Sequence, residues 1–537
     1  MSKRLASAES ASDSKRLESL VKRVENEYTK YFPGEKNGAV DVIEVPESAE
    51  DITAFLKKYV LERKPCKIKG VVSQDVLLKG LNPANITTAL PADEILQVER
   101  KVEGGFGSGE KRILLTLGEF MRRLGEGEGN LYLTTQYAED KDAEDDDYEG
   151  GSQRVAQEAE EFYNESESEE ELEEDEIAAF PSADEFSDGG SFSMDNAHDD
   201  FDEINSPEDD QPEAQLETGA LSAAEAEQRV RELYQPPMNH LVNRLPETPE
   251  FMKKLIPQQI NLWIGSTAGT ETNDDAFLSK FDPQAPKMGL GRFVPSGGSS
   301  SGLHHDHADN IYVPISGRKR FTLFSPRDAA KMYTVGAIRN VYNSGVIDYA
   351  QGEQSPLWRS LRDDGAILAE VAHQELLHNA SLSLDEKNRM QKFIDTDEAT
   401  QNGKEPSAKL DPPSFSTVAP AIVHLDKIKD KTVREKIHAK ALEKWPLFLQ
   451  ANRLVVDLEP GEMLYLPTGW FHEVTSFGKE NAASAQDQIH VAVNYWFVPP
   501  NGETIENLYP HEDKYWPLDF ERTQAAVDKV RQRAPSV

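Results

Sequence analysis

Residues 301–307, Ser-Gly-Leu-His-His-Asp-His, combine imidazole and carboxylate groups at a spacing that suits metal binding. His304 and Asp306 are two residues apart, so both side chains leave the same face of an extended strand. A third ligand, His472, follows the sequence EMLYLPTGWF, in which a predicted strand ends at Pro467. Two histidines and one carboxylate on one face of a metal leave three coordination positions open, as in non-haem iron(II) oxygenases.

Taken alone, a His-x-Asp sequence is more often a solvated polar loop than a pair of metal ligands. The following strand adds context, because Lys319 shares a face with Phe321 and Leu323, whereas Arg318 and Arg320 share the other. A lysine among inward apolar residues is a buried ammonium, which is costly unless an anion pairs with it. We therefore expect a ligand carboxylate there. The alternative is a lysine at a strand end whose ammonium reaches solvent.

The segment from 301 to 319 resembles the motif of the JmjC-domain 2-oxoglutarate oxygenases. That motif has Thr or Ser three residues before the first histidine of HxD, Asn six residues after it and Lys fifteen after it. Here these positions hold Ser301, Asn310 and Lys319, at the same spacing. The later segment GEMLYLPTGWFHEV is similar to the family block that supplies the distal histidine, and AVNYW then supplies Asn494.

Two upstream segments resemble the asparaginyl and lysyl hydroxylase branch of that family. NLYLTTQY is similar to the strand that precedes the core, with Tyr132 at the position of a cosubstrate-binding tyrosine, and FLKKYVLERKPCKIKG is similar to the opening helix and strand. Three features depart from the compact hydroxylases. They are an acidic insertion, an excursion of roughly 120 residues between Arg327 and Pro446, and a 22-residue gap from His472 to Asn494.

The resemblance implies an iron(II) ion held by His304, Asp306 and His472, with 2-oxoglutarate and O2 as cosubstrates. It assigns 2-oxoglutarate binding to Tyr132, Ser301, Asn310, Lys319 and Asn494. The offsets of Asn and Lys in the motif fit only His304 and Asp306. We therefore interpret His305 and His307 as residues of the rim, possible contacts of the substrate, or as residues that lie behind the metal ligands.

The pattern of elements favours a mainly β fold with helical decoration. Short predicted strands interrupted by long insertions indicate a double-stranded β-helix, or jelly roll of the cupin type, with a disordered acidic insertion. Residues 1–13 are predicted to be loose, and amphipathic helices are predicted from Leu17 to Tyr31 and from Phe520 to Arg533. The predicted divisions are an N-terminal tail and helix (1–37), the first part of the cupin-like domain (38–137), the acidic insertion (138–222), the core with HxD (223–330), a helical or irregular insertion (331–445), the core with the distal histidine (446–503) and a C-terminal helical segment (504–537).

The acidic residues are concentrated in one stretch. The 537-residue chain has a formal charge of −38, and residues 138–217 hold 33 acids against two bases, so the remainder carries only about −7. High charge with little apolar content is typical of disorder, because too little surface can be buried to offset the ordering entropy. The near-neutral remainder offers no basic face for direct nucleic-acid binding.

Cysteine content and hydropathy exclude further classes. A single cysteine, Cys66, excludes disulfide scaffolds, Cys-rich zinc modules and Cys-ligated iron–sulfur clusters. The chain has no run of 18 apolar residues, and its first thirty residues lack the apolar core of a secretory signal. We therefore expect no membrane span and a cytoplasmic or nuclear location.

The resemblance implies hydroxylation of a protein side chain. A lysyl target is favoured, because one member of the branch acts on a lysine of a GTP-binding protein. The alternative is demethylation of a lysine in a histone or another protein, although chromatin demethylases of the family usually carry the Cys-rich modules that one cysteine excludes. In a different class, the acidic tract would make the chain an interaction protein or scaffold for basic partners. A homodimer through the C-terminal helix is also predicted.

Overall fold

The structure is a computed structural model that describes residues 2–101, 105–106, 112–136, 221–269, 279–295, 297–401 and 411–533. The predicted acidic insertion lies almost wholly outside these residues. Within the described ranges, no helix combines the length and the apolar character needed to cross a lipid bilayer.

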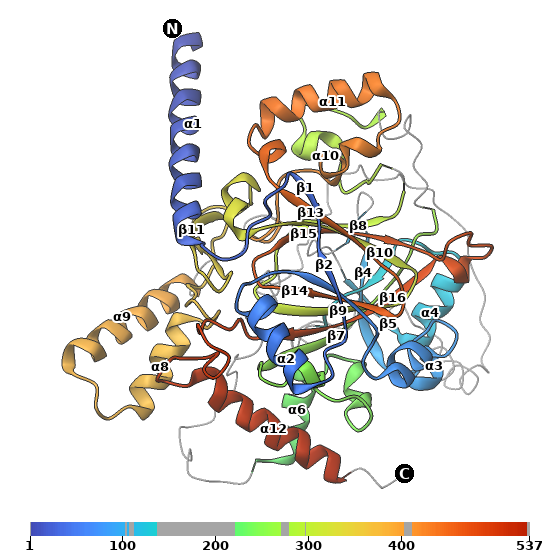
Figure 1. Cartoon of the computed structure of the whole chain (residues 1–537), viewed down its shortest axis with the longest axis vertical. Helices are drawn as coiled ribbons and strands as arrows, with labels where there is room; N and C mark the ends of the chain where they lie inside the picture. The colour runs from blue at the N-terminus through green and yellow to red at the C-terminus, as the bar shows by residue number, and fades with distance from the viewer. Residues whose placement is uncertain are drawn as a thin grey trace, which may run out of the picture.

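Two β-sheets form the centre of the molecule (Figure 1). The smaller sheet has the strand order β1-β13-β10-β15-β8, and the larger has the order β2-β3-β14-β9-β16-β7-β6-β4-β5. A separate hairpin, β11-β12, belongs to the insertion between the two halves of the core. The strands are β1 (Asn37–Ala39), β2 (Asp41–Glu44), β3 (Cys66–Lys69), β4 (Ile95–Arg100), β5 (Arg112–Thr116), β6 (Leu131–Leu133), β7 (Pro257–Ser266), β8 (Ser299–His304), β9 (Asp309–Ser316), β10 (Arg318–Phe324), β11 (Ala337–Val341), β12 (Ile347–Ala350), β13 (Arg453–Leu458), β14 (Glu462–Leu466), β15 (Phe471–Phe477) and β16 (Ile489–Phe497).

The inner faces of the two sheets pack on each other. A single buried cluster joins Phe321, Leu323 and Val474 of the smaller sheet to Tyr312 and Ala492 of the larger. These side chains alternate along their strands with residues that face outward, as expected for a jelly roll whose strands are buried on both sides. The predicted jelly-roll fold is therefore confirmed.

Helices cover the outer faces of both sheets (Figure 1). Outward residues of the larger sheet pack against α2, α4, α6 and α12, whereas α1, α10 and α11 pack outside the smaller sheet. The helices are α1 (Ser2–Glu27), α2 (Ala49–Phe55), α3 (Ile86–Ala89), α4 (Leu117–Gly125), α6 (Ala223–Leu233), α8 (Leu368–His378), α9 (Leu384–Gln401), α10 (Pro420–Val423), α11 (Lys431–Lys444) and α12 (Tyr515–Arg533).

Several elements differ from the sequence-based expectations. Helix α1 begins at Ser2 rather than near Leu17, so the expected loose start is wrong. Its first half is rich in Ala, which favours helix without an apolar stripe, and also in Ser, which favours helix less. The insertion between the core halves contains the β11-β12 hairpin as well as helices. Strand β15 was not predicted, and His472 lies within it rather than in a turn.

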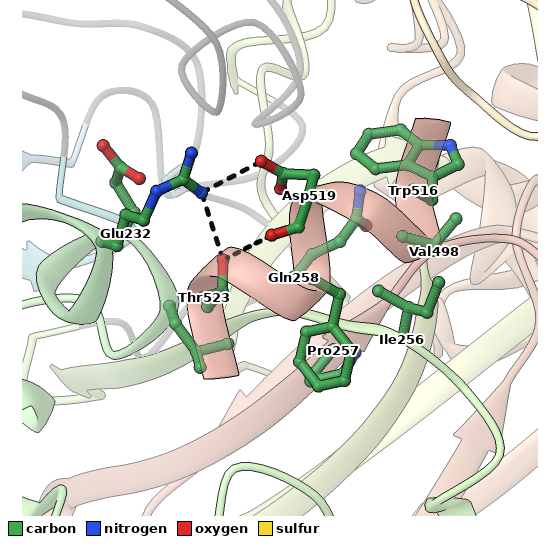
Figure 2. Close-up of a pocket in the computed structure, with 11 residues that line it drawn as sticks. Glu232, Ile256, Pro257, Gln258, Val498, Trp516, Asp519 and Thr523 are labelled. Atoms are coloured by element: carbon green, nitrogen blue, oxygen red, sulfur yellow. Dashed lines mark hydrogen bonds and ion pairs between the residues drawn. The ribbon is translucent and has the colours of Figure 1, made fainter. Parts of the chain in front are cut away.

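A small cleft lies where α12 meets α6 and β7 (Figure 2). Arg229 of α6 donates hydrogen bonds to Asp519 (3.0 Å) and Thr523 (3.3 Å) of α12 across it. Trp516 closes one end and donates from its indole nitrogen to the carbonyl of Asp364. None of the predicted site residues lines this cleft, so we interpret it as the seam that joins the C-terminal helix to the core.

Candidate functional site

The three predicted metal ligands converge at one end of the jelly roll. His304 ends β8 and pairs directly with His472 of β15, while Asp306 lies in the loop that leads to β9. The Nε2 atom of His304 is 3.8 Å from one carboxylate oxygen of Asp306, and Nε2 of His472 is 3.7 Å from the other. The ligand atoms of all three residues lie within 4.8 Å of one another.

Backbone carbonyls fix both imidazole rings with Nε2 directed at the shared centre. Nδ1 of His304 donates to the carbonyl of Gly302 (3.1 Å), and Nδ1 of His472 donates to the carbonyl of Trp470 (2.9 Å). Each ring then presents a lone pair on Nε2, as a metal ligand must. Burial, the neighbouring His472 and Arg292 together hold the pKa of His304 well below its usual value, so its imidazole is neutral.

A segment of the insertion covers His304. The ring of Phe415 stacks on the imidazole at a centroid distance of 4.8 Å and an interplanar angle of 13°. Arg292 holds this segment, because its guanidinium lies over the Phe415 ring and pairs with Asp411. The same guanidinium donates to the carbonyl of Ser301 (2.9 Å), so it links the segment to β8.

A buried cluster of polar groups lies further inside the jelly roll, at the start of β10. Lys319 is fully buried, and its ammonium donates to the hydroxyl of Ser476 (2.7 Å) and to Nδ1 of His490 (3.1 Å). Burial and the nearby Lys101 hold the pKa of Lys319 well below its usual value. We call Lys319, Ser476, His490 and Tyr132 the Lys319 cluster.

Tyr132 reaches the cluster from β6 across a glycine. Its ring lies 5.7 Å from that of His490, and its side chain interacts with Ser476. Gly265 of β7 sits between them, and a Cβ there would overlap both the Tyr132 ring and the imidazole. The row Tyr132, Gly265, His490 therefore depends on glycine at its centre.

The other predicted cosubstrate residues have different surroundings. The hydroxyl of Ser301 donates to the carbonyl of Gly302 (2.8 Å) and accepts from the amide of Val474 (3.1 Å), so it lies in the bulge between β8 and β15. Asn494 accepts a hydrogen bond from the indole of Trp263 (2.9 Å). The structure brings Lys319 and Tyr132 together, and it places Ser301 with the backbone near the metal ligands.

Sequence reasoning missed several residues of this region. His490 and Asn494 are four residues apart on one strand and face the same way, so the alternation of β16 was a usable signal. Ser476 could have been found by the same argument from His472, had β15 been predicted. Lys101 and Phe415 carry no such signal, because segments distant in sequence bring them to the site.

His305 and His307 do not lie on the rim, so that alternative is wrong and the place behind the metal ligands is the one that remains. Both are buried, and the β11-β12 hairpin covers them. Nε2 of His305 is 2.6 Å from the hydroxyl of Tyr349, and Nε2 of His307 donates to the carbonyl of Ile347 (2.7 Å).

A second group of one histidine and two carboxylates, Asp363, Asp364 and His511, lies elsewhere in the structure. Arg362 pairs with Asp364 and so neutralises part of its negative charge.

The described residues fit an iron(II) ion and a dicarboxylate. Two imidazoles and one carboxylate are a donor set suited to iron(II). The Lys319 cluster presents buried hydrogen-bond donors, and its buried polar atoms are not all satisfied within the described part of the chain. Within the described residues, Nε2 of His490 in the cluster has no hydrogen-bond partner, and neither has Oγ of Ser299, the residue opposite Ser476. Oδ1 of Asn310, near the start of β9, is a further such atom outside the cluster. Such groups need a polar partner.

Comparisons with known proteins extend over most of the chain. A sequence model of the cupin-like domain family matches residues 52–503. JmjC domain-containing protein 4 of Schizosaccharomyces pombe is 26% identical over 572 aligned residues, which cover 94% of each chain. Lysine-specific demethylase JMJ32 of Arabidopsis thaliana is 22% identical over 242 residues, 45% of this chain and 42% of its own.

A shorter match has a higher sequence identity than the two long alignments. The tRNA wybutosine-synthesizing protein 5 of Mus musculus is 40% identical over 68 residues, which are 12% of this chain and 21% of its own. The long alignments and the family match, taken with the jelly roll and its histidine–carboxylate centre, agree in one assignment. The chain belongs to the cupin-like, JmjC-domain family.

Proposed function

We propose that the protein is an iron(II)- and 2-oxoglutarate-dependent dioxygenase that hydroxylates a protein side chain. The family includes oxygenases and demethylases of this kind. The observation that carries the proposal is the convergence of His304, Asp306 and His472 in the same jelly roll as the buried ammonium of Lys319. A metal centre would explain why the two histidines and the aspartate converge, and a carboxylate ligand would explain why the ammonium of Lys319 is buried.

The chain's own residues have separate tasks in this proposal. His304, Asp306 and His472 hold the iron, which when bound supplies a site where O2 is activated. Lys319 binds the far carboxylate of 2-oxoglutarate through a charge-assisted hydrogen bond, supported by Tyr132 and Ser476. The reaction converts substrate C–H, O2 and 2-oxoglutarate into substrate C–OH, succinate and CO2. Phe415 shields one face of His304 from water.

The proposed target is a lysyl residue of a protein, for example of a GTP-binding protein. The second candidate is lysine demethylation, in a histone or another protein, and the name of the Arabidopsis relative favours it. The single cysteine supports hydroxylation, because it excludes the Cys-rich modules that chromatin demethylases usually carry. An interaction protein that uses its acidic tract to bind basic partners is the candidate of another class. A cytoplasmic or nuclear location is proposed with each.

The enzyme proposal is tested by anaerobic titration of the protein with Fe(II) and 2-oxoglutarate. We expect the weak visible charge-transfer band of the chelate, and slow formation of succinate once O2 is admitted. Asp306→Ala should abolish both signals. Asp363→Ala, in the second histidine–carboxylate group, is the matched control and should retain them. Folded wild-type protein without the band, indistinguishable from Asp306→Ala, would contradict the proposal.

The target is identified with the same variant. Asp306→Ala retains the substrate-binding surface but cannot turn over, so proteins that co-purify with it are substrate candidates. Mass spectrometry of their peptides after incubation with wild-type enzyme distinguishes the two reactions. Hydroxylation adds the mass of one oxygen atom, whereas demethylation removes that of a methylene group.

A further inference from the structure

The loops that carry two of the proposed metal ligands are bonded to each other. The carbonyl of Asp306 accepts a hydrogen bond from the amide of Gly469 (2.9 Å), and the carbonyl of Trp470 orients His472 through its Nδ1. Gly469 has a positive φ of 73°, and a Cβ there would overlap the carbonyl of Gly345. The tight turn from 467 to 470 thus determines where both Asp306 and His472 lie.

A buried carboxylate three residues after Asp306 holds this turn. Oδ1 of Asp309 accepts hydrogen bonds from the amide (3.0 Å) and the hydroxyl (2.7 Å) of Thr468. Oδ2 accepts from the hydroxyl of Tyr465 on β14 (2.7 Å). Asp309, Thr468 and Tyr465 are all fully buried. One carboxylate therefore bonds both the turn and the neighbouring strand.

Arg63 supplies the opposite charge from a distant part of the chain. Its guanidinium makes a two-pronged ion pair with Asp309, through Nη1 to Oδ2 (2.9 Å) and through Nη2 to Oδ1. Burial disfavours the charged guanidinium, but the carboxylate of Asp309 more than offsets this and raises the pKa of Arg63. The backbone carbonyl of Arg63 accepts from the indole of Trp470 (3.0 Å), so Arg63 also holds the far end of the turn.

We infer that Asp309 and Arg63 are positioning residues, which orient Asp306 and His472 for metal binding by holding the turn 467–470. This inference rests on the proposed function, since it assumes that the three ligands bind iron. It assigns no contact with the metal to either residue. His304 lies on β8, so its position should depend less on the ion pair. Loss of a hydrogen bond that the turn donates to Asp309 should therefore weaken metal binding without abolishing it.

Thr468→Val tests the inference with little change in shape. The substitution removes only the hydroxyl bond to Asp309, and we expect the dissociation constant for Mn(II), measured by calorimetry on the full chain, to rise about tenfold or more. Thr468→Ser keeps a hydroxyl and should restore affinity close to that of wild type. Mn(II) is the probe because it binds the same donors without oxidation in air.

Tyr465→Phe is the matched control. It removes a hydrogen bond of the same length to the same carboxylate, from an equally buried residue that lies outside the turn. Both variants should lose similar thermal stability, while only Thr468→Val loses Mn(II) affinity. If both variants lost Mn(II) affinity equally, or if Thr468→Val lost none, the positioning role would be overturned while the proposed function would stand. A wild-type protein that binds no Mn(II) would overturn the proposed function and the inference with it.

Discussion

Two lysines share the buried region around Tyr132. The ammonium of Lys101 donates to the carbonyl of Ser266 (2.5 Å) and lies 5.7 Å from the centre of the Tyr132 ring. Burial, offset in part by Glu99, lowers its pKa to about 7. Lys101 also disfavours the charged forms of Lys319 and His490. A bound carboxylate would relieve this repulsion.

The affinity for 2-oxoglutarate should therefore depend on pH. A bound anion favours the ammonium form of Lys101, so binding takes up a proton wherever the free protein has lost it, that is, above about pH 7. We expect the contribution of Lys101 to lower the affinity by up to about tenfold per pH unit above that pH. Calorimetric titration of the Mn(II)-loaded protein between about pH 6 and about pH 8.5 measures this slope. Lys101→Met should flatten the profile, and an unchanged slope in that variant would assign the titration to another group.

At the level of the strand, the alternation of side chains along β10 places one basic residue inside the jelly roll and two on its outer face. Lys319 faces the interior, whereas Arg318 and Arg320 face outward and pair with Asp457 of β13. Lys319→Met should raise the dissociation constant for 2-oxoglutarate by roughly 30-fold or more, because losing a charge-assisted bond to a buried carboxylate costs on the order of 2 to 5 kcal/mol.

Arg320→Met is the control, one residue away on the opposite face. It should leave 2-oxoglutarate affinity nearly unchanged, and neither variant should alter Mn(II) affinity, which depends on other residues. The comparison is made by fluorescence or calorimetric titration of the metal-loaded proteins. If Arg320→Met weakened 2-oxoglutarate binding more than Lys319→Met, the face of β10 that we assign to the interior of the jelly roll would be the wrong one.

Strands in which apolar and polar side chains alternate, and strands with a continuous apolar run, could be predicted from the sequence. The apolar runs of β9, β14 and β16 and the Ser-Gly turn before β10 mark these strands clearly. Strand β15 was missed because its sequence, FHEVTSF, is polar on both faces. Its outward Glu473 is buried and bonded to His424 and Ser300, which come from the C-terminal end of α10 and from β8.

The candidate site likewise contains some residues that a local sequence pattern predicts and others that only tertiary packing brings together. The spacing of His304, Asp306 and Lys319 is local, so the sequence alone was enough to single them out; His304 ends β8, Asp306 lies in the following loop and Lys319 lies on β10. The ion pair of Arg63 and Asp309 joins residues 246 positions apart, and no local pattern predicts it. Phe415 reaches His304 from the long insertion, whose path over the core depends on tertiary packing rather than on periodicity.

At the level of the whole molecule, the acidic tract should be dispensable for folding. Its composition argues that it adds nothing to the core, and the described jelly roll contains the candidate site without it. Deleting residues 140–217 should change Tm by less than about 2 °C, which corresponds to under about 1 kcal/mol, and leave succinate formation near wild type. Differential scanning calorimetry and a turnover assay provide the measurements. A large fall in Tm would show that the tract packs on the core.

The predicted homodimer through the C-terminal helix stays a prediction. Within the chain, α12 packs Trp516, Ala526 and Val527 against its own core and α6. A second copy would therefore have to use the remaining face of the helix.

The order of strands has a consequence for synthesis on the ribosome. Strand β16 is the last strand of the described residues, yet it lies between β7 and β9 in the centre of the larger sheet. Strand β1 similarly pairs with β13, and the side chains of Asn37 and Arg453 in that pair are 416 residues apart. A nascent chain that has not yet released Phe497 exposes two long unpaired strand edges, which can pair with other chains. From this topology we expect the unfinished chain to need protection by chaperones, and the proposed metal site to form only after β16 has paired.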